Sequence, residues 1–333
     1  MKKMILICSV LAAFTWTTAV TVNAKVTKLT MATSHPVDHM ATEIVKETIK
    51  KIETGTKNRV KINLFPANQL GDYVQVYDEV MRGTIDMAHI SVPETHDKRL
   101  GACMLPYLTP DYASVKKVLG QDSNLYKQTS QFHQKLGVKF LGFFTEGFIG
   151  IGTVKKASVP ATPGRDKGVL IRTSGMATMV TSANGIGFRT TTIPYADVFP
   201  ALQTGVADGW IGGPANLNYL IFRDVIKFFY NYNVTQEITQ AIMNSEKISK
   251  LTPADQKVII DAFREFSIQS FELSEQEDNK YRALLRKAGV EVVEFSPEEM
   301  SAISKSVREF SWPKLEKVYT SELMDLIQKD INK

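Results

Sequence analysis

Two histidines stand four residues apart in the segment His35-Pro36-Val37-Asp38-His39, with an aspartate between them. Imidazole and carboxylate groups are common zinc ligands, so this spacing could hold a metal ion. The glutamate of the helical zinc protease motif is missing, however, and Pro36 would break or start a helix between the two histidines. We therefore expect no metal here, and we interpret the segment as the start of a helix with proline at an early position.

The residues that enzymes use as nucleophiles and bases do not form a recognisable set. The sequence has no Gly-x-Ser-x-Gly segment, no phosphate-binding loop and no Gly-x-Gly-x-x-Gly, and the glycine-rich segment 147–152 lacks that spacing. His89 and His133 have no partner visible in the sequence. Cys103 lies among apolar neighbours, which favours a buried, inert thiol. We therefore expect neither an enzyme nor a bound cofactor.

The composition fits a chain of two globular lobes. It has 333 residues, of which 44% are hydrophobic and 23% charged, and a domain usually takes about 100 to 200 residues. This composition excludes a disordered or collagen-like chain. Lys and Arg number 40 against 35 Asp and Glu. That excess is too small to indicate a phosphate-binding surface, so we expect no nucleic-acid partner.

The N-terminal residues have the pattern of an export signal. Lys2 and Lys3 precede an apolar stretch at 4–20, and residues 22–24 are the small residues that a signal peptidase requires. Polar residues dilute the apolar stretch, and no other window approaches a membrane span in length. We therefore expect a signal peptide at 1–24, cleaved near Ala24, and a mature protein in the periplasm.

Strands and helices alternate from the start of the predicted mature chain. Apolar periodicity predicts strands at 28–33, 59–65 and 85–92, with helices at 40–52 and 74–81 between them. This β-α-β-α-β order indicates a mostly parallel sheet with helices on both faces.

The same signals continue along the rest of the chain. They predict helices at 116–135, 196–204 and 218–227, a long helix at 252–287, strands at 138–144, 150–154, 168–172, 185–192, 233–236 and 290–295, and a last helix that opens at Ser296. Because the α/β pattern resumes after the long helix, the two lobes should share the chain by crossing between them more than once. Such a layout forms a cleft between lobes, where small ligands bind.

Short segments that are individually weak recur in the order and spacing of one protein family. They lie at 59–62 (RVKI), 65–71 (FPANQLG), 83–88 (GTIDMA), 105–108 (LPYL), 171–173 (IRT) and 201–209 (ALQTGVADG). Over nearly all of the predicted mature chain, the sequence resembles the periplasmic substrate-binding subunit of tripartite ATP-independent periplasmic (TRAP) transporters, DctP type.

The resemblance implies a two-lobed α/β fold that is hinged by strands and a long helix and closes on an organic anion. It also implies delivery of that ligand to two partners, a small and a large integral membrane subunit, by a monomeric binding protein. On this basis we expect lobe I to comprise residues 25–149 and 238–277, and lobe II to comprise residues 150–237 and 278–333.

In that family the arginine of the segment corresponding to 170–172 makes a two-pronged contact with the ligand carboxylate, so the resemblance assigns this role to Arg172. The chemistry is sound in itself. A guanidinium stays charged and offers parallel donors that match a carboxylate. Each such charge-assisted bond contributes about 1.5 to 3 kcal/mol.

The sequence also departs from the family pattern. Where many sialic-acid and dicarboxylate binders carry a second arginine, this chain has the segment 145–148 (TEGF), so we expect no second anionic contact. Where a ligand-binding asparagine is expected, Gly212 stands instead, two residues after Trp210. Asn216 or Asn218 would have to substitute for that amide.

Aromatic residues are the remaining candidates for the cleft wall. Tyr195 matches an aromatic that lines the family's cleft, and with Phe148 and Trp210 it would surround the arginine clamp. Ordinary core packing would explain the same three residues, because aromatics are common in cores. If they line the cleft, the ligand should be a monocarboxylate with an apolar or aromatic body.

Two loops should also reach the ligand. Ligands bind beyond the carboxyl ends of parallel strands, and these ends carry Ser34 and His35 after the first predicted strand, and Ser91 and Glu94 after the third. Glu94 or Glu146 could pair with an amino group, which would make the ligand an amino acid.

Two alternatives stay open at this point. A periplasmic binding protein could serve a signalling partner instead of a transporter, since both need only a surface that ligand closes. The ligand could also be a dicarboxylate, a sugar acid or an amino acid. A gene for a membrane subunit nearby would distinguish a transport protein from a sensor.

Overall fold

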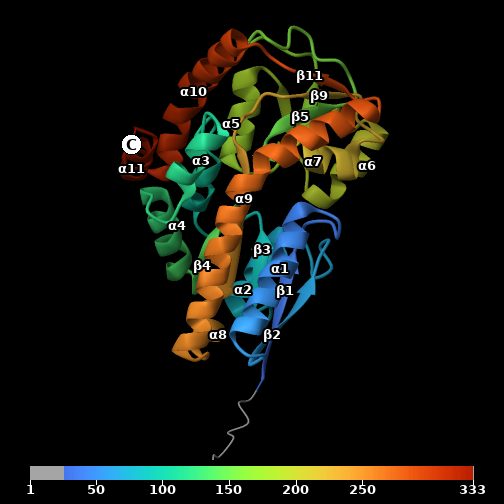
Figure 1. Ribbon diagram of the computed structural model, residues 1–333. Helices are drawn as coiled ribbons and strands as arrows, with labels where there is room; N and C mark the ends of the chain where they lie inside the picture. Colours follow the sequence, from blue (N-terminus) through green and yellow to red (C-terminus); the bar gives the residue numbers. More distant parts are fainter. Residues whose placement is uncertain (1–25, 333) are drawn as a thin grey trace, which may run out of the picture.

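The computed structural model describes residues 26–332 and places them in two lobes, each built around one sheet (Figure 1). The predicted two-lobed α/β fold is therefore confirmed. The predicted signal peptide lies outside the described residues. Among residues 26–332, no helix combines the length and the apolar character that a membrane crossing requires.

The first sheet has the strand order β2-β1-β3-β10-β4. Its strands are β1 (Thr27–Thr33), β2 (Val60–Phe65), β3 (Met87–Ile90), β4 (Val138–Phe148) and β10 (Gln236–Asn244). The helices around it are α1 (Met40–Gly55), α2 (Tyr73–Arg82), α3 (Tyr112–Leu119), α4 (Asn124–Lys135) and α8 (Ser245–Ser249), and a 3-10 helix spans Lys98–Met104. β1, β2 and β3 are parallel, whereas β10 runs antiparallel to both of its neighbours, β3 and β4.

The second sheet has the order β11-β9-β5-β8-β6-β7. Its strands are β5 (Gly150–Thr153), β6 (Leu170–Thr173), β7 (Arg189–Thr192), β8 (Gly209–Gly213), β9 (Phe228–Tyr230) and β11 (Glu291–Val293). Its helices include α5 (Ala177–Ile186), α6 (Val198–Thr204), α7 (Ala215–Leu217) and α10 (Pro297–Tyr319). The strand that is reversed relative to its neighbours is β5, which lies between β8 and β9.

The long helix α9 (Pro253–Lys287) runs along both lobes (Figure 1). It begins as the sequence predicts, because the Thr252 side chain accepts a hydrogen bond from the Asp255 backbone N–H and Pro253 occupies the first helical turn. Near its start Phe263 packs into the core of the first sheet. Near its end Leu285 packs into a core of the second sheet. Both lobes therefore share one continuous helix.

The chain crosses from the first sheet to the second at Ile149 and returns just before β10. The two crossing segments are paired, because Ile149 N–H donates to Thr235 O at 2.8 Å and Val234 N–H donates to Ile149 O at 3.1 Å. Next to this crossing the register of β4 and β10 shifts, with Gln236 opposite Phe148 and Ile238 opposite Thr145.

This shift is a β-bulge in which two residues of β4, Glu146 and Gly147, lie opposite one residue of β10, Glu237. Gly147 has φ +121°, a conformation that side chains with a Cβ rarely adopt. The bulge therefore places two glutamates opposite each other at the point where the chain passes between lobes.

Several predicted elements have different bounds in the structure. The helix predicted at 116–135 is two helices, because α3 ends before Gly120 and Ser123 caps the start of α4. The segment predicted as a strand at 185–192 contains the end of α5 and the strand β7. The predicted strand 233–236 lies mostly before the true strand, β10, which runs from Gln236 to Asn244.

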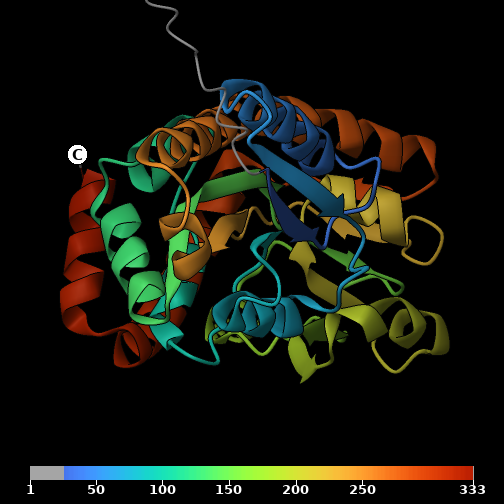
Figure 2. The same ribbon diagram turned by 90° about the horizontal axis from the view of Figure 1, so that it is seen from below.

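The C-terminal residues form two helices rather than one, α10 and α11 (Ser321–Asn332). α10 packs against α5, and α11 packs against α3 and α4. Figure 2 shows these red C-terminal helices beside the green helices at one edge of the molecule. The predicted lobe boundaries, which assign all of 278–333 to one lobe, stay a prediction.

Candidate functional site

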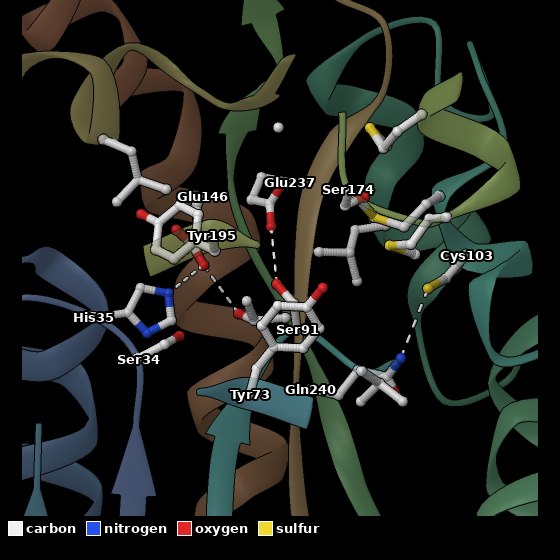
Figure 3. Close-up of a pocket in the computed structure, with 18 of the residues that line it drawn as sticks. Ser34, His35, Tyr73, Ser91, Cys103, Glu146, Ser174, Tyr195, Glu237 and Gln240 are labelled. Atoms are coloured by element: carbon white, nitrogen blue, oxygen red, sulfur yellow. Dashed lines mark hydrogen bonds and ion pairs between the residues drawn. The ribbon is translucent and has the colours of Figure 1, made fainter. Parts of the chain in front are cut away.

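A cleft lies between the two sheets and takes its lining from both. The space within it that atoms leave empty, including the part open to solvent, is about 830 Å³, which suits a small molecule. Polar groups gather around His35, Glu146 and Tyr195 on one side, and Cys103 lies with other sulfur atoms on the far side (Figure 3). The cleft thus has a polar part and an apolar part.

Arg172 is the cationic group of the polar part. It stands on β6, and its side chain is almost fully buried, with 3% of the residue exposed. Its Nε donates to the Ile193 carbonyl at 2.7 Å. No carboxylate of residues 26–332 forms an ion pair with it, and Asp72 and Glu237 attract it only at longer range. Burial lowers its pKa, but a guanidinium remains charged at any ordinary pH. A buried cation without an ion-pair partner carries a desolvation penalty that a bound anion would offset.

Gly212 leaves space beside this guanidinium. A Cβ built on Gly212 would lie 3.7 Å from Arg172 Nη1, and its φ of +135° disfavours any other residue. Tyr195 is also near the cation, with the guanidinium carbon 6.0 Å from the ring centroid. The lack of a side chain at Gly212 leaves space next to the guanidinium.

Glu146 is a buried carboxylate that several donors hold in place (Figure 3). His35 Nε2 lies 2.6 Å from Oε1, and the Thr239 hydroxyl donates to the same oxygen at 3.0 Å. Burial by itself would raise the pKa of Glu146, but the charge and the hydrogen bond of His35 outweigh it, so the pKa is lowered. Glu146 is therefore the ionised carboxylate of the cleft.

His35, His39 and Glu146 also place their polar atoms within 4.8 Å of one another, which is the one arrangement resembling a metal site in residues 26–332. The hydrogen bonds argue against that use. His39 Nδ1 accepts the Ala41 backbone N–H at 3.1 Å and so caps α1. The proton of the neutral ring must then be on Nε2, which points to Glu146 at 3.5 Å and has no lone pair left for a cation. Within this group His35 and Glu146 are hydrogen-bonded, and His39 lies beside them without a hydrogen bond to the carboxylate.

Glu237 is the second buried carboxylate, and it lines the same cleft. Among residues 26–332 its hydrogen-bond partner is Ser91, whose hydroxyl donates to Oε1 at 3.2 Å (Figure 3). Burial raises the pKa of Glu237 well above its usual range, and the negative charge of Glu146 raises it further. The two glutamates therefore have environments that push their pKa values apart.

The apolar part of the cleft is rich in sulfur. Its lining residues are Val92, Leu100, Cys103, Met104, Met176 and Met179. Cys103 is buried, as predicted, and its Sγ lies 3.5 Å from Leu100 O and 3.7 Å from Gln240 Nε2. Burial raises the pKa of this thiol to about 12, so it stays protonated. Thioethers are flexible and polarisable, so this wall can adapt to an apolar group.

Some of the residues singled out from the sequence meet in this cleft. Ser34, His35, Ser91, Arg172, Tyr195 and Gly212 all line it. These residues come from the ends of four strands, β1 and β3 of the first sheet and β6 and β8 of the second, and from the turn before α6. Whether each of them contacts a ligand stays a prediction.

The other predicted residues do not line the cleft, and the expected wall of three aromatics needs correction. Trp210 is fully buried and donates from Nε1 to Asn218 Oδ1 at 3.0 Å, and its ring packs on Phe222. Phe148 packs edge-on against Tyr112. Both belong to the packing of the lobes, which was the alternative interpretation of these residues.

Two polar residues also have structural partners. Asn216 bonds the Glu146 carbonyl and the Leu217 backbone N–H. Glu94 accepts hydrogen bonds from the Tyr319 hydroxyl at 2.8 Å and from the Ala177 N–H at 3.3 Å. Neither Asn216 nor Glu94 lines the cleft, so the amide contact predicted for Asn216 and the amino contact predicted for Glu94 stay predictions without support from the cleft lining.

The sequence analysis missed Glu237, Tyr73 and the methionines of the cleft. Every residue of β10 is buried, so this strand lacks the alternation of polar and apolar residues that indicates a half-buried strand. The signal available for Glu237 was the polar pair Gln236-Glu237 in the segment between Val234 and Ile238. Buried polar residues are uncommon and usually have a partner or a functional role.

Comparison with known proteins assigns the chain to a family. Residues 31–317 match the model of the bacterial extracellular solute-binding proteins, family 7 (DctP), and the protein belongs to this family. The resemblance to TRAP binding proteins is thereby confirmed. The family consists of solute-binding receptors and not of enzymes.

Among curated relatives, the 2,3-diketo-L-gulonate-binding periplasmic protein YiaO of Escherichia coli K12 is 26% identical over 247 residues, which are 73% of each chain. The C4-dicarboxylate-binding periplasmic protein DctP of Rhodobacter capsulatus is 24% identical over 256 residues, 75% of each chain. A TRAP periplasmic solute-binding protein from Haemophilus influenzae, solved with bound L-gulonate, superimposes with a TM-score of 0.82 at 23% identity, over 92% of this chain and 99% of that one. The solved structure shares the fold.

Proposed function

We propose that this protein is the extracytoplasmic solute-binding subunit of a TRAP transporter and that it binds a monocarboxylate with an apolar body through Arg172. The observation that carries the proposal is the buried guanidinium of Arg172, which has no anionic partner among the described residues and faces a cleft. Nη1 and Nη2 are the donors that a carboxylate would use, since Nε already bonds Ile193 O.

The apolar body of the ligand would lie toward the sulfur-rich part of the cleft. Leu100, Met104, Met176 and Met179 supply that wall, in place of the aromatic wall expected from the sequence. Ionised Glu146 opposes a second carboxylate on the ligand by like-charge repulsion, which favours a monocarboxylate over a dicarboxylate.

In function, the two lobes would close over the bound acid, and the closed form would dock on the membrane subunits. A ligand shifts an opening and closing equilibrium only by its difference in affinity for the two forms. Arg172 stands on the second sheet and Glu146 on the first, so a ligand that bridges them favours the closed form. Periplasmic location, after removal of a signal peptide, and a monomeric state complete the proposal.

Relatives with different ligands define the competing outcome. YiaO is a 2,3-diketo-L-gulonate-binding protein, and the Haemophilus influenzae protein was solved with bound L-gulonate. Here Ser34, Ser91 and Glu146 in the polar part could bond the hydroxyl groups of a sugar acid. This arrangement keeps a hydroxylated monocarboxylate as the second candidate ligand.

Thermal unfolding with a panel of acids tests the proposal. The purified mature chain is melted with branched and aromatic monocarboxylates, sugar acids, small dicarboxylates and amino acids. A ligand at 100 times its Kd adds about 2.7 kcal/mol to the free energy of unfolding, which raises Tm by several degrees. A rise with branched or aromatic monocarboxylates is expected, and a rise confined to dicarboxylates would refute the proposed ligand class.

A further inference from the structure

The bulge between β4 and β10 places two buried glutamates opposite each other. Glu146 and Gly147 together face Glu237 across the strand pair, and both carboxylates line the cleft. Side chains in opposite positions of neighbouring strands lie close enough to interact, and two like charges there destabilise the pair. Both groups are also removed from water, so they cannot both be ionised at neutral pH without a large penalty.

The hydrogen bonds decide which of the two carries the charge. Glu146 accepts from His35 Nε2 at 2.6 Å and from the Thr239 hydroxyl at 3.0 Å, and His39 Nε2 stands 3.5 Å from its second oxygen. Glu237 accepts from a single neutral hydroxyl, that of Ser91. Donors stabilise the ionised form of a carboxyl group. The negative charge therefore belongs to Glu146.

The other groups that face Glu237 do not reverse this assignment. One of them, Arg172, is a cation whose charge lowers the pKa of Glu237, but burial and the charge of Glu146 outweigh it and the pKa stays raised. The remaining titratable neighbours are uncharged. They are the phenol of Tyr73 on α2, the phenol of Tyr195 in the turn before α6 and the thiol of Cys103 on the 3-10 helix. With Glu237 uncharged, Glu146 is the negative charge that opposes the positive charge of Arg172 in the empty cleft.

We propose that Glu237 stands in the cleft as an uncharged carboxylic acid and donates a hydrogen bond to an acceptor oxygen of the bound acid. This inference rests on the proposed function, because it names the group next to the carboxylate that Arg172 would hold. The acceptor is a carbonyl, ether or hydroxyl oxygen near the ligand carboxylate. An ammonium group at that position cannot accept the hydrogen bond from the O–H of Glu237, so we expect α-amino acids to bind more weakly than the matching oxo acids.

The first experiment measures the protonation of Glu237 in the empty protein, without any ligand. Infrared spectra of the mature chain at pH 7 are compared with those of Glu237→Gln, with glutamate carboxyls labelled with carbon-13. The C=O absorption of a protonated carboxyl should lose intensity in Glu237→Gln. It should keep that intensity in Glu146→Gln, because Glu146 is ionised. Glu272→Gln, at an exposed position of α9, is the matched control for the substitution itself.

Loss of the protonated C=O band in Glu146→Gln instead of Glu237→Gln would overturn the proposal, as would no loss in either variant. Since the half-buried Glu94 and the buried Asp278 are also carboxyls whose pKa is raised, the comparison uses the difference between wild type and variant. This measurement does not depend on which acid the protein binds.

The second experiment tests donation to the ligand with a matched pair of probes. 3-Methyl-2-oxobutanoate and L-valine share a carboxylate and a branched body and differ only in the group at the 2-position. The oxo group can only accept a hydrogen bond, whereas the ammonium can only donate. Calorimetric titration should give tighter binding of the oxo acid, by tenfold or more, and L-valine binding more tightly would overturn the proposal.

Two substitutions extend this test. Glu237→Ala removes the donor and should weaken the oxo acid about tenfold, the effect of losing one buried hydrogen bond. Glu237→Gln keeps an N–H donor and should weaken it less. Equal losses in both variants would overturn donation by Glu237. If no acid of the panel raises the wild-type Tm, the proposed function fails, while the infrared result still decides the state of Glu237.

Discussion

Replacing Arg172 by methionine should remove the affinity for organic acids while making the empty protein at least as stable. Two charge-assisted hydrogen bonds from Nη1 and Nη2 would contribute about 1.5 to 3 kcal/mol each. Their loss corresponds to about 3 to 6 kcal/mol, or a Kd that rises by about two to four powers of ten. Because methionine retains an unbranched apolar side chain, it still fills much of the space of the arginine stem.

The expected stability of the empty variant follows from the surroundings of the guanidinium. In the absence of ligand, Arg172 is a buried charge whose one protein hydrogen bond joins Nε to Ile193 O at 2.7 Å. Losing that bond costs about 1 kcal/mol, whereas removing a buried charge without an ionic partner relieves a desolvation penalty of several kcal/mol. The net effect on Tm without ligand should therefore be zero or positive.

The assay is thermal unfolding of wild type and Arg172→Met, with and without the acid that gives the largest shift. Arg189→Met is the matched control, because Arg189 is exposed at the start of the neighbouring strand β7. Wild type and Arg189→Met should both rise with ligand, and Arg172→Met should not. A fall of several degrees in Tm for the empty Arg172→Met protein would show that the guanidinium stabilises the fold, and the reasoning would be refuted.

Three further changes have defined outcomes. Burial lowers the pKa of His39 from 6.5 to about 4, so its contribution to stability is complete above pH 6.5 and is lost as pH falls toward 4. His39→Asn keeps a capping side chain and should therefore make the fall of Tm over that pH range less steep. An unchanged slope of Tm against pH would contradict this. Gly147→Ala should destabilise the protein by about 1 to 3 kcal/mol, because φ at this position is +121° and the added Cβ would lie 3.3 Å from atoms of Asp278 and Pro214. Denaturant unfolding measures this loss of stability. A variant as stable as the wild type would argue against the bulge. Met176→Gln should weaken the binding of branched acids by about 1 to 2 kcal/mol and that of short acids much less, as measured by calorimetric titration. Equal losses for both kinds of acid would show that Met176 is not part of the apolar wall.

Local signals in the sequence predict most of the elements that position the site. The strand before Ser34 and the start of α9 follow from alternation and from capping residues such as Thr252. Motif order identifies the family, and with it the position of Arg172 on β6. These features are local, so a single sequence contains them.

The parts that could not be predicted depend on contacts between distant segments. β10 is buried along its whole length because it is enclosed by β3 and β4, so its side chains show no periodic pattern. Glu237 meets Glu146 only through the register of a strand pair whose members are about ninety residues apart in the chain. Likewise, Trp210 and Phe148 are aromatic whether they face a ligand or a core, and only packing distinguishes the two.

The position of β10 also constrains how the chain can be assembled. β3 and β4 do not pair with each other; β10 occupies the place between them, antiparallel to both. As the chain is made or exported from its N-terminus, the first sheet therefore consists of separate pieces with unpaired edges until residue 244 has emerged. Exposed strand edges invite association with other chains, and closing them by a strand so distant in sequence is slow. Because β10 comes so late in the chain, we expect the first sheet to stay incomplete while the chain crosses a membrane. The chain should then need protection from aggregation until β10 is available to pair.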